Sequence, residues 1–259
     1  MIEKTIHYVW LGSKKIPENF VVFIDNWRRL HPDWKIIKWN EDNYDCENNE
    51  WIKLAIEQEN YSLAADVIRS NVLLNYGGVY LDTDIELFKP LDEFADENDF
   101  FIGYETDLWF GCAVLGAKKG HAIMREVYAR YLTPCEKIDE SSNMLCVLNF
   151  SAAIKRLYDV KLDGKTKKIE DNTKLFSTDY FFPQHYITHK TKMTDNTAAM
   201  HHYSSTWHSK GKSIGIKFAR LTRILLGKRI FMCFEKIARI NMLTQLKKEY
   251  RKRNKNVTQ

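Results

Sequence analysis

Hydrophobic and polar residues follow two different spacings along the first forty positions. A run of β-branched and aromatic residues over 5–11 ends at Gly12 and predicts a buried strand. The next apolar residues recur at helical spacing and predict a helix over 18–30: Phe20, Phe23, Ile24, Trp27 and Leu30. His31-Pro32 ends that helix, because the residue before proline disfavours helical backbone. Residues 35–39 then predict a second short strand.

The same pattern continues through the middle of the chain. Further helices are predicted over 50–59, 62–76, 121–131 and 143–157, and further strands over 79–81, 99–104 and 110–115. Gly77-Gly78 ends the second of these helices. The polar stretch 159–174 predicts an exposed connection. Strands that alternate with helices predict an α/β domain with a largely parallel sheet.

Charge divides the chain in two. The whole sequence has 39 Lys+Arg and 34 Asp+Glu, a net charge of +5. Residues 210–259 hold 15 of the basic residues and only two acids, which is +13, so the remainder carries 24 basic and 32 acidic residues, or −8. We therefore expect an acidic domain over 1–209 and a basic tail over 210–259.

The tail has apolar residues at spacings of four, three and four, at Ile214, Phe218, Leu221 and Leu225, with basic residues between them. This predicts a basic amphipathic helix or helix pair within 213–246, interrupted at Gly227. It either packs on the body as a helical cap or lies on an anionic cytoplasmic membrane.

Composition excludes several classes of protein. A hydrophobic fraction of 44% is too high for a disordered or collagen-like chain. The five cysteines are odd in number and form no C-x-x-C pair, which argues against a disulfide framework or a thiolate zinc site and fits a reduced cytosol. Charged residues interrupt the first twelve positions, so we expect no export signal. The sequence has no run of 18 apolar residues, so we expect no membrane-spanning helix.

Asp82-Thr83-Asp84 is the first candidate for chemistry. The two carboxylates follow a predicted strand, and the carboxyl ends of strands are where open α/β sheets bind ligands. Such a pair can hold a hard divalent cation, which in turn binds a diphosphate. The alternative is a pair of solvated turn residues.

Three other groups are candidates with structural alternatives. Asp66 and Arg69 share one face of the predicted 62–76 helix, either as a surface ion pair or as ligands for sugar hydroxyls and phosphate. Trp10 is either core or a stacking platform for a nucleobase. In the segment 201–207, His202 and Ser205 are neutral groups that could complete a metal shell.

In this order, these motifs resemble those of the DXD glycosyltransferases of family 32, which include yeast outer-chain mannosyltransferases and bacterial polysaccharide transferases. The glucosyltransferase domains of large clostridial toxins are similar in the same segments. The resemblance is carried by Thr5–Gly12, Ala64–Arg69, Tyr76–Asp84 and His201–Trp207. It implies a Rossmann-like nucleotide-sugar-binding domain of GT-A type, here with a basic helical extension at the C-terminus.

The resemblance also implies roles for individual residues. Trp10 would stack on uracil and Tyr80 would line the nucleotide pocket, while Asp66 and Arg69 would hold the transferred sugar against the diphosphate. Asp82 would contact the ribose and a metal-bound water, and Asp84 would bind the metal directly. Where the toxin branch has an acid in the late loop, this chain has His202, so the third ligand is either His202 or His201. Ser205 would contribute to metal and donor binding, and Trp207 would close over the phosphates.

These expectations combine into one functional hypothesis. The chain is expected to be a retaining transferase that uses Mn²⁺ or Mg²⁺ and moves a hexose, galactose or glucose preferred, from a UDP-sugar to a saccharide or lipid-linked acceptor in surface polysaccharide synthesis. Glu105 and Asp107 are candidates for acceptor contacts. We expect a cytoplasmic protein, peripheral on the inner face of the membrane, that binds no nucleic acid. The alternatives are a metal-dependent nucleotidyltransferase or phosphoesterase, and a non-catalytic nucleic-acid binder that uses the tail.

Overall fold

The computed structural model describes residues 1–106, 109–135, 138, 142, 145–186 and 189–204, all within the compact unit Met1–Trp207. Its centre is a seven-stranded sheet in the order β2-β1-β3-β6-β5-β8-β7. The strands are β1 (Thr5–Val9), β2 (Lys35–Trp39), β3 (Gly78–Leu81), β5 (Phe100–Tyr104), β6 (Phe110–Ala117), β7 (Lys167–Ile169) and β8 (Thr173–Phe176). A second sheet pairs β4 (Ile85–Leu87) with β9 (Ala199–His201).

The α/β class is confirmed, but the prediction of a largely parallel sheet is wrong. The pairs β1–β2, β1–β3 and β5–β8 are parallel, whereas β3–β6, β5–β6 and β7–β8 are antiparallel. The antiparallel β6 lies between β3 and β5, and only a short loop joins it to β5. Strand alternation with helices therefore predicted the class of the fold but not the direction of every strand.

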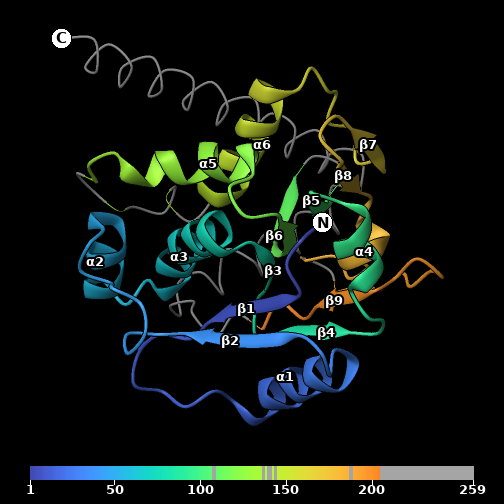
Figure 1. Ribbon diagram of the computed structural model, residues 1–259. Helices are drawn as coiled ribbons and strands as arrows, with labels where there is room; N and C mark the ends of the chain where they lie inside the picture. The colour runs from blue at the N-terminus through green and yellow to red at the C-terminus, as the bar shows by residue number, and fades with distance from the viewer. Residues whose placement is uncertain (107–108, 136–137, 139–141, 143–144, 187–188, 205–259) are drawn as a thin grey trace, which may run out of the picture. The chain divides into compact units, whose positions relative to one another are not determined.

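Helices cover both faces of the main sheet (Figure 1). In chain order they are α1 (Glu18–Leu30), α2 (Glu50–Glu57), α3 (Tyr61–Tyr76), α4 (Asp92–Glu97), α5 (Ala122–Ala129), the 3-10 turn η1 (Arg130–Leu132), α6 (Leu145–Leu157) and α7 (Thr178–Phe181). Each face has its own apolar core, because successive strand residues point in opposite directions. In β3, Tyr80 belongs to the core under α2, α3, α5 and α6, whereas Val79 and Leu81 belong to the core under α1, α4 and α7.

The predicted exposed connection 159–174 is wrong in part, because it contains β7 and the start of β8. Strand β7 has the sequence KKI and none of its residues is fully buried. It lies at the end of the main sheet and forms backbone pairs with β8 alone. Pairing rather than burial holds this edge strand, so its apolar pattern is weak. The predicted tail and the boundary at 209 lie outside the described residues.

Helix α3 and strand β3 meet at two glycines that position the candidate residues. Gly77 ends α3 with φ +70°, and Gly78 begins β3 with φ +99°, a left-handed backbone that other residues rarely adopt. His7 of β1 fixes the junction: its Nε2 bonds the Gly77 carbonyl at 2.9 Å, and its Nδ1 accepts the Trp39 indole N–H at 3.0 Å. The tight junction sets helix α3 directly against the strand that leads to Asp82.

Candidate functional site

A buried arginine joins two carboxylates at the α3–β3 junction. Asp66 and Arg69 lie one turn apart on α3, and both side chains are almost fully buried. The Nη2 atom of Arg69 lies 3.2 Å from Asp66 Oδ1 and 3.0 Å from Asp82 Oδ1. Its Nη1 donates to the carbonyl of Cys112 on β6 at 2.5 Å. The pair is therefore not a solvated surface ion pair, and one guanidinium fixes both acids.

The ring of Tyr80 packs against the guanidinium of this arginine. The Arg69 guanidinium carbon lies 4.2 Å from the centre of the Tyr80 ring, a cation–π contact, and the Tyr80 side chain is 1% exposed. The predicted role of Tyr80 in lining the nucleotide pocket stays a prediction, and in the structure its side chain contacts Arg69 and Asp82.

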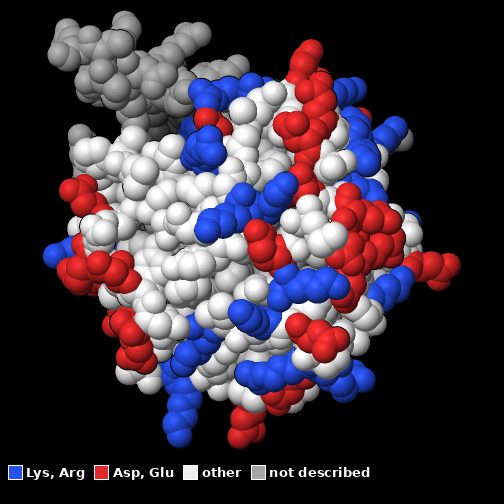
Figure 2. All heavy atoms as spheres, in the orientation of Figure 1, with Lys and Arg blue, Asp and Glu red and all other residues white. Residues whose placement is uncertain are grey.

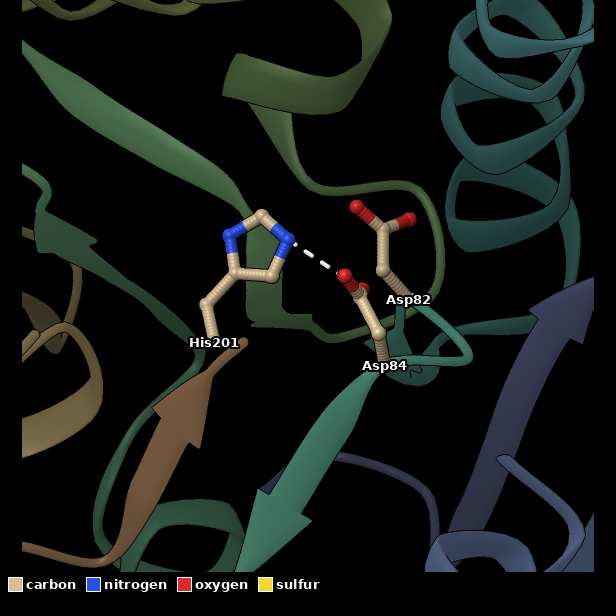
Figure 3. A group of neighbouring side chains, drawn as sticks. All are labelled: Asp82, Asp84 and His201. Atoms are coloured by element: carbon tan, nitrogen blue, oxygen red, sulfur yellow. Dashed lines mark ion pairs between the residues drawn. The ribbon is translucent and has the colours of Figure 1, made fainter. Parts of the chain in front are cut away.

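The second half of the site comes from the small sheet. Asp84 precedes β4, and His201 ends β9, where it pairs in register with Ile85. The Nε2 atom of His201 lies 3.1 Å from Asp84 Oδ1, and the backbone N–H of Ser204 donates to Asp84 Oδ2 at 2.9 Å (Figure 3). Residues 117 positions apart in sequence thus meet because β4 and β9 pair.

Asp82, Asp84 and His201 form a group that fits a divalent cation. One ligand atom from each lies within 4.8 Å of the other two, and Figure 3 shows the three side chains converging. Two carboxylate oxygens and one imidazole nitrogen suit a hard or borderline ion such as Mn²⁺. Among the described residues, the Nδ1 atom of His201 and the Nε atom of Arg69 are buried without a hydrogen-bond partner.

His202 turns away from this group. Its Nε2 lies 2.9 Å from Glu86 Oε2, and its ring stacks on Phe23 of α1 at 4.9 Å between centroids. Neighbouring residues at the end of a strand point to opposite faces, so only one of the two histidines can face the aspartates. The geometry favours His201, the alternative left open by the sequence, over His202 as the nitrogen ligand.

The charges of the site are coupled. Burial alone would raise the pKa of Asp84, but His201 and the Ser204 N–H lower it to about 2. Burial opposes the charged form of His201, yet Asp84, Asp82 and Glu105 raise its pKa to about 9. Burial raises the pKa of Asp66 to about 6 even though Arg69 opposes that shift. Without a cation, the His201 imidazolium supplies the positive charge beside Asp84.

The remaining predicted residues have different positions. Trp10 follows β1, is 7% exposed, donates from Nε1 to the Lys14 carbonyl at 2.6 Å and contacts the edge of Phe20. Stacking of Trp10 on a base stays a prediction. Ser205, Trp207 and Asp107 lie outside the described residues. Glu105, which follows β5, lies among His201, Tyr203 and Asp82.

Sequence reasoning missed the contacts of three residues near the site. The backbone carbonyl of Cys112 accepts a hydrogen bond from Arg69, whereas Glu86 and Phe23 contact His202 on the side of β9 that faces away from the aspartates. No sequence pattern marks a backbone carbonyl as a ligand. The adjacent histidines did carry one usable signal, since strand alternation allows only one of them to face Asp84.

Part of the chain that carries the site matches a known family. Residues 17–101, which include Asp66, Arg69, Asp82 and Asp84, match the family described as glycosyltransferase sugar-binding region containing DXD motif. Inositol phosphoceramide mannosyltransferase 1 of Schizosaccharomyces pombe is 33% identical over 42% of this chain and 38% of that protein. Subversion of eukaryotic traffic protein A of Legionella pneumophila is 26% identical over 42% of this chain and 20% of that protein. The chain thus spans less than half the length of these relatives.

A solved structure shares the fold. The PaToxG glycosyltransferase superposes with a TM-score of 0.51 at 16% identity, over 61% of this chain and 70% of that chain. This likeness concerns the fold, and it confirms the expected GT-A-type architecture. Over residues 17–101 the chain is similar to the DXD-containing sugar-binding region of the glycosyltransferases, which confirms the resemblance drawn from its sequence.

Proposed function

We propose that the chain is a retaining, metal-dependent glycosyltransferase that moves a hexose from a UDP-sugar to a saccharide or lipid-linked acceptor in surface polysaccharide synthesis. The observation that carries the proposal is the adjacency of two groups that share Asp82. On one side Arg69 joins Asp82 to Asp66, and on the other Asp84 and His201 complete a ligand set. A donor that combines a sugar with a diphosphate requires both groups at one place.

Each residue has a defined part in this proposal. Asp82, Asp84 and His201 would hold Mn²⁺ or Mg²⁺, which neutralises the charge that develops on a diphosphate leaving group. Arg69 lies beside Asp82 and adds positive charge on the same side. Asp66, fixed by Arg69, presents a carboxylate oxygen to sugar hydroxyls. The buried guanidinium pre-organises both carboxylates, so neither has to reorient when the donor binds.

The donor sugar is the least constrained part of the proposal. We favour a UDP-hexose with galactose or glucose, and a nucleotide-activated mannose is the second candidate. The second candidate is supported by a relative, since the similar Schizosaccharomyces pombe protein is an inositol phosphoceramide mannosyltransferase. Both donors present a hexose and a diphosphate, so the same residues would serve either.

A panel of nucleotide sugars, incubated with the protein with and without Mn²⁺ and followed by mass spectrometry, tests the reaction class. We expect Mn²⁺-dependent release of the nucleoside diphosphate together with free or transferred hexose. Release of a nucleoside monophosphate and a sugar phosphate would instead indicate a nucleotidyltransferase or phosphoesterase, which would use the same aspartates on a different bond. No turnover of any donor would reject the transferase.

Asp84→Asn tests whether the Asp84 carboxylate is needed for metal-dependent turnover rather than for folding. The amide keeps the side-chain shape but removes the charge, so we expect donor turnover to be abolished while the circular dichroism spectrum stays unchanged. Asp25→Asn is the control, because Asp25 is exposed on α1 and pairs only with Arg28 among the described residues. Near-normal turnover of Asp84→Asn would contradict the metal assignment.

Membrane association is proposed for the basic segment 213–246. No helix among the described residues is long and apolar enough to cross a membrane. The net charge of +13 over 210–259 supports attraction to an anionic inner membrane face, where a lipid-linked acceptor would be presented. Deletion of 213–259 should abolish co-sedimentation of the protein with anionic liposomes. Neutral liposomes should not sediment the protein with or without this segment. Unchanged sedimentation would reject this part.

The charge of the body disfavours nucleic acid as the partner. Figure 2 shows acidic side chains gathered over the region of α4, to which Asp92, Glu93, Asp96 and Glu97 belong. Residues 1–209 together carry a net charge of −8, which repels a phosphate backbone. The tail alone would then have to bind nucleic acid, and retention of RNA or DNA that falls steeply with salt would support that alternative.

A further inference from the structure

Asp82 and Glu105 leave the main sheet at the same edge. Strands β3 and β5 each pair antiparallel with β6, so they run in the same direction. Asp82 is the first residue after β3, and Glu105 is the first residue after β5. The carboxyl ends of such strands meet at one edge of a sheet, which is where α/β folds bind their ligands.

Glu105 lies beside the cation group without belonging to it. Its charged neighbours are His201 and Asp82, and its polar neighbour is the phenol of Tyr203. It is not among the three residues whose ligand atoms lie within 4.8 Å of one another. Among the described residues Glu105 forms no ion pair with lysine or arginine, and the positive group beside it is His201, which also pairs with Asp84. Glu105 therefore has no cationic partner of its own.

Tyr203 is held in a strained conformation next to this carboxylate. Its φ is +52°, in the left-handed region that bulky residues rarely adopt. In this conformation the centre of its ring lies 4.1 Å from the centre of the His201 ring, and its phenol lies next to Glu105. Strain of this kind costs about 1–3 kcal/mol and persists where the surroundings fix it, often at a binding site.

Glu105 and Asp66 contact different sides of the site. Asp66 and Arg69 approach Asp82 from α3, whereas Glu105, His201 and Tyr203 approach it from β5 and from the end of β9. Figure 3 shows Asp82 and His201 reaching the group from opposite sides. If Asp66 and Arg69 hold the donor sugar, Glu105 faces the side on which the second substrate must enter.

We propose that Glu105, oriented by Tyr203, binds a hydroxyl group of the acceptor. This inference rests on the proposed transferase function and names the acceptor chemistry as a polyhydroxylated compound such as a hexose. The carboxylate has only acceptor oxygens, so it is suited to a ligand that offers hydroxyl donors. Glu105 has no part in binding the cation or the nucleotide, which the proposed function assigns to other residues.

The test is hexose binding to the protein in a complex with Mn²⁺ and UDP. Saturation-transfer NMR with a set of methyl α- and β-hexosides reports binding without turnover. We expect binding to the unmodified protein, a loss of about tenfold or more in affinity for Glu105→Gln, and unchanged Mn²⁺ and UDP affinities for that variant. Glu86→Gln is the control, because Glu86 contacts His202 on the other side of β9 and should bind hexosides normally.

Three results would overturn the assignment: no hexoside binding by the unmodified protein, normal binding by Glu105→Gln, or a parallel loss of Mn²⁺ or UDP affinity in that variant. The donor panel is read separately. Absence of donor turnover would reject the transferase function, and hexoside binding would still decide the role of Glu105.

Discussion

The two halves of the candidate site are built in different ways. The first half, Asp66, Arg69 and Asp82, comes from helix α3 and the residue that follows the next strand, β3, within 17 residues of sequence. The second half, Asp84 and His201, depends on the pairing of β4 with β9 across more than a hundred residues. The side chains of Arg69 and Asp66 are 5% and 9% exposed, whereas those of Asp84 and His201 are 13% and 16% exposed and that of Asp82 is 29% exposed. Asp66 and Arg69 are thus part of the core, and Asp82 links them to the more exposed second half.

This difference predicts different responses to mutation. Changes in the first half should act on folding stability as well as on activity, because buried charges lose their partners. Changes in the second half should act mainly on ligand binding. Its side chains are more exposed, so water can replace the contacts that a substitution removes.

Arg69→Gln should be the most destabilising change. It leaves the buried Asp66 and the partly exposed Asp82 without their shared cation, which costs about 3–5 kcal/mol of unfolding free energy. Arg28→Gln is the matched control, since Arg28 pairs with Asp25 on the surface of α1 and should cost less than about 1 kcal/mol. Urea denaturation measures both. Equal effects of the two variants would show that Arg69 is not a structural centre of the first half.

His7 should make stability depend on pH below neutrality. Trp39 can only donate, so His7 Nδ1 accepts and Nε2–H donates to Gly77, which leaves the buried ring neutral. Burial lowers the pKa of His7 from 6.5 to about 4, so the unfolded chain takes up the proton first as pH falls. The stabilisation is complete above pH 6.5 and about 3 kcal/mol is lost between pH 6.5 and 4.

His7→Gln provides the comparison for that pH dependence. Glutamine can accept from Trp39 and donate to Gly77 without titrating, so its unfolding free energy should fall less steeply over the same range. Parallel pH profiles for the two proteins would exclude His7 as the source.

Gly78→Ala tests the junction between α3 and β3 with a smaller effect. A Cβ at position 78 would lie 2.6 Å from the Thr5 carbonyl oxygen and 2.9 Å from His7 Nε2, in addition to the cost of φ +99°. We expect a loss of about 1–3 kcal/mol in unfolding free energy. At Gly120 φ is +75° but a Cβ would have no atom within 4 Å, so Gly120→Ala should lose less. A loss at Gly120 equal to that at Gly78 would mean that φ alone, not contact with His7, fixes the junction.

The same comparison explains what could be predicted from sequence. Helix α1 and strand β2 begin and end at the predicted residues, because their apolar spacing and Pro32 are local signals. Asp66 and Arg69 were found because helical spacing places them on one face. The nitrogen ligand was not resolved, since the choice between His201 and His202 depends on the register of β9 against β4. Pairing between distant strands has no local signature, and for the same reason β7 was predicted as loop.

Burial was the other quantity that sequence did not supply. Spacing allowed Asp66 and Arg69 to be a surface pair, but α3 is covered by α2, α5 and the sheet, which places the pair in the core. Trp10 similarly proved to be packed against Phe20, a contact that no motif predicts.

The central claim is that Asp82, Asp84 and His201 bind a divalent cation. The most direct test is titration of Mn²⁺ into the protein and into His201→Ala and His202→Ala, followed by calorimetry. We expect His201→Ala to weaken Mn²⁺ binding about tenfold or more. The Mn²⁺ affinity of His202→Ala, which loses only the side-chain contacts with Glu86 and Phe23, should stay within about twofold. Loss of binding in His202→Ala with normal binding in His201→Ala would contradict it.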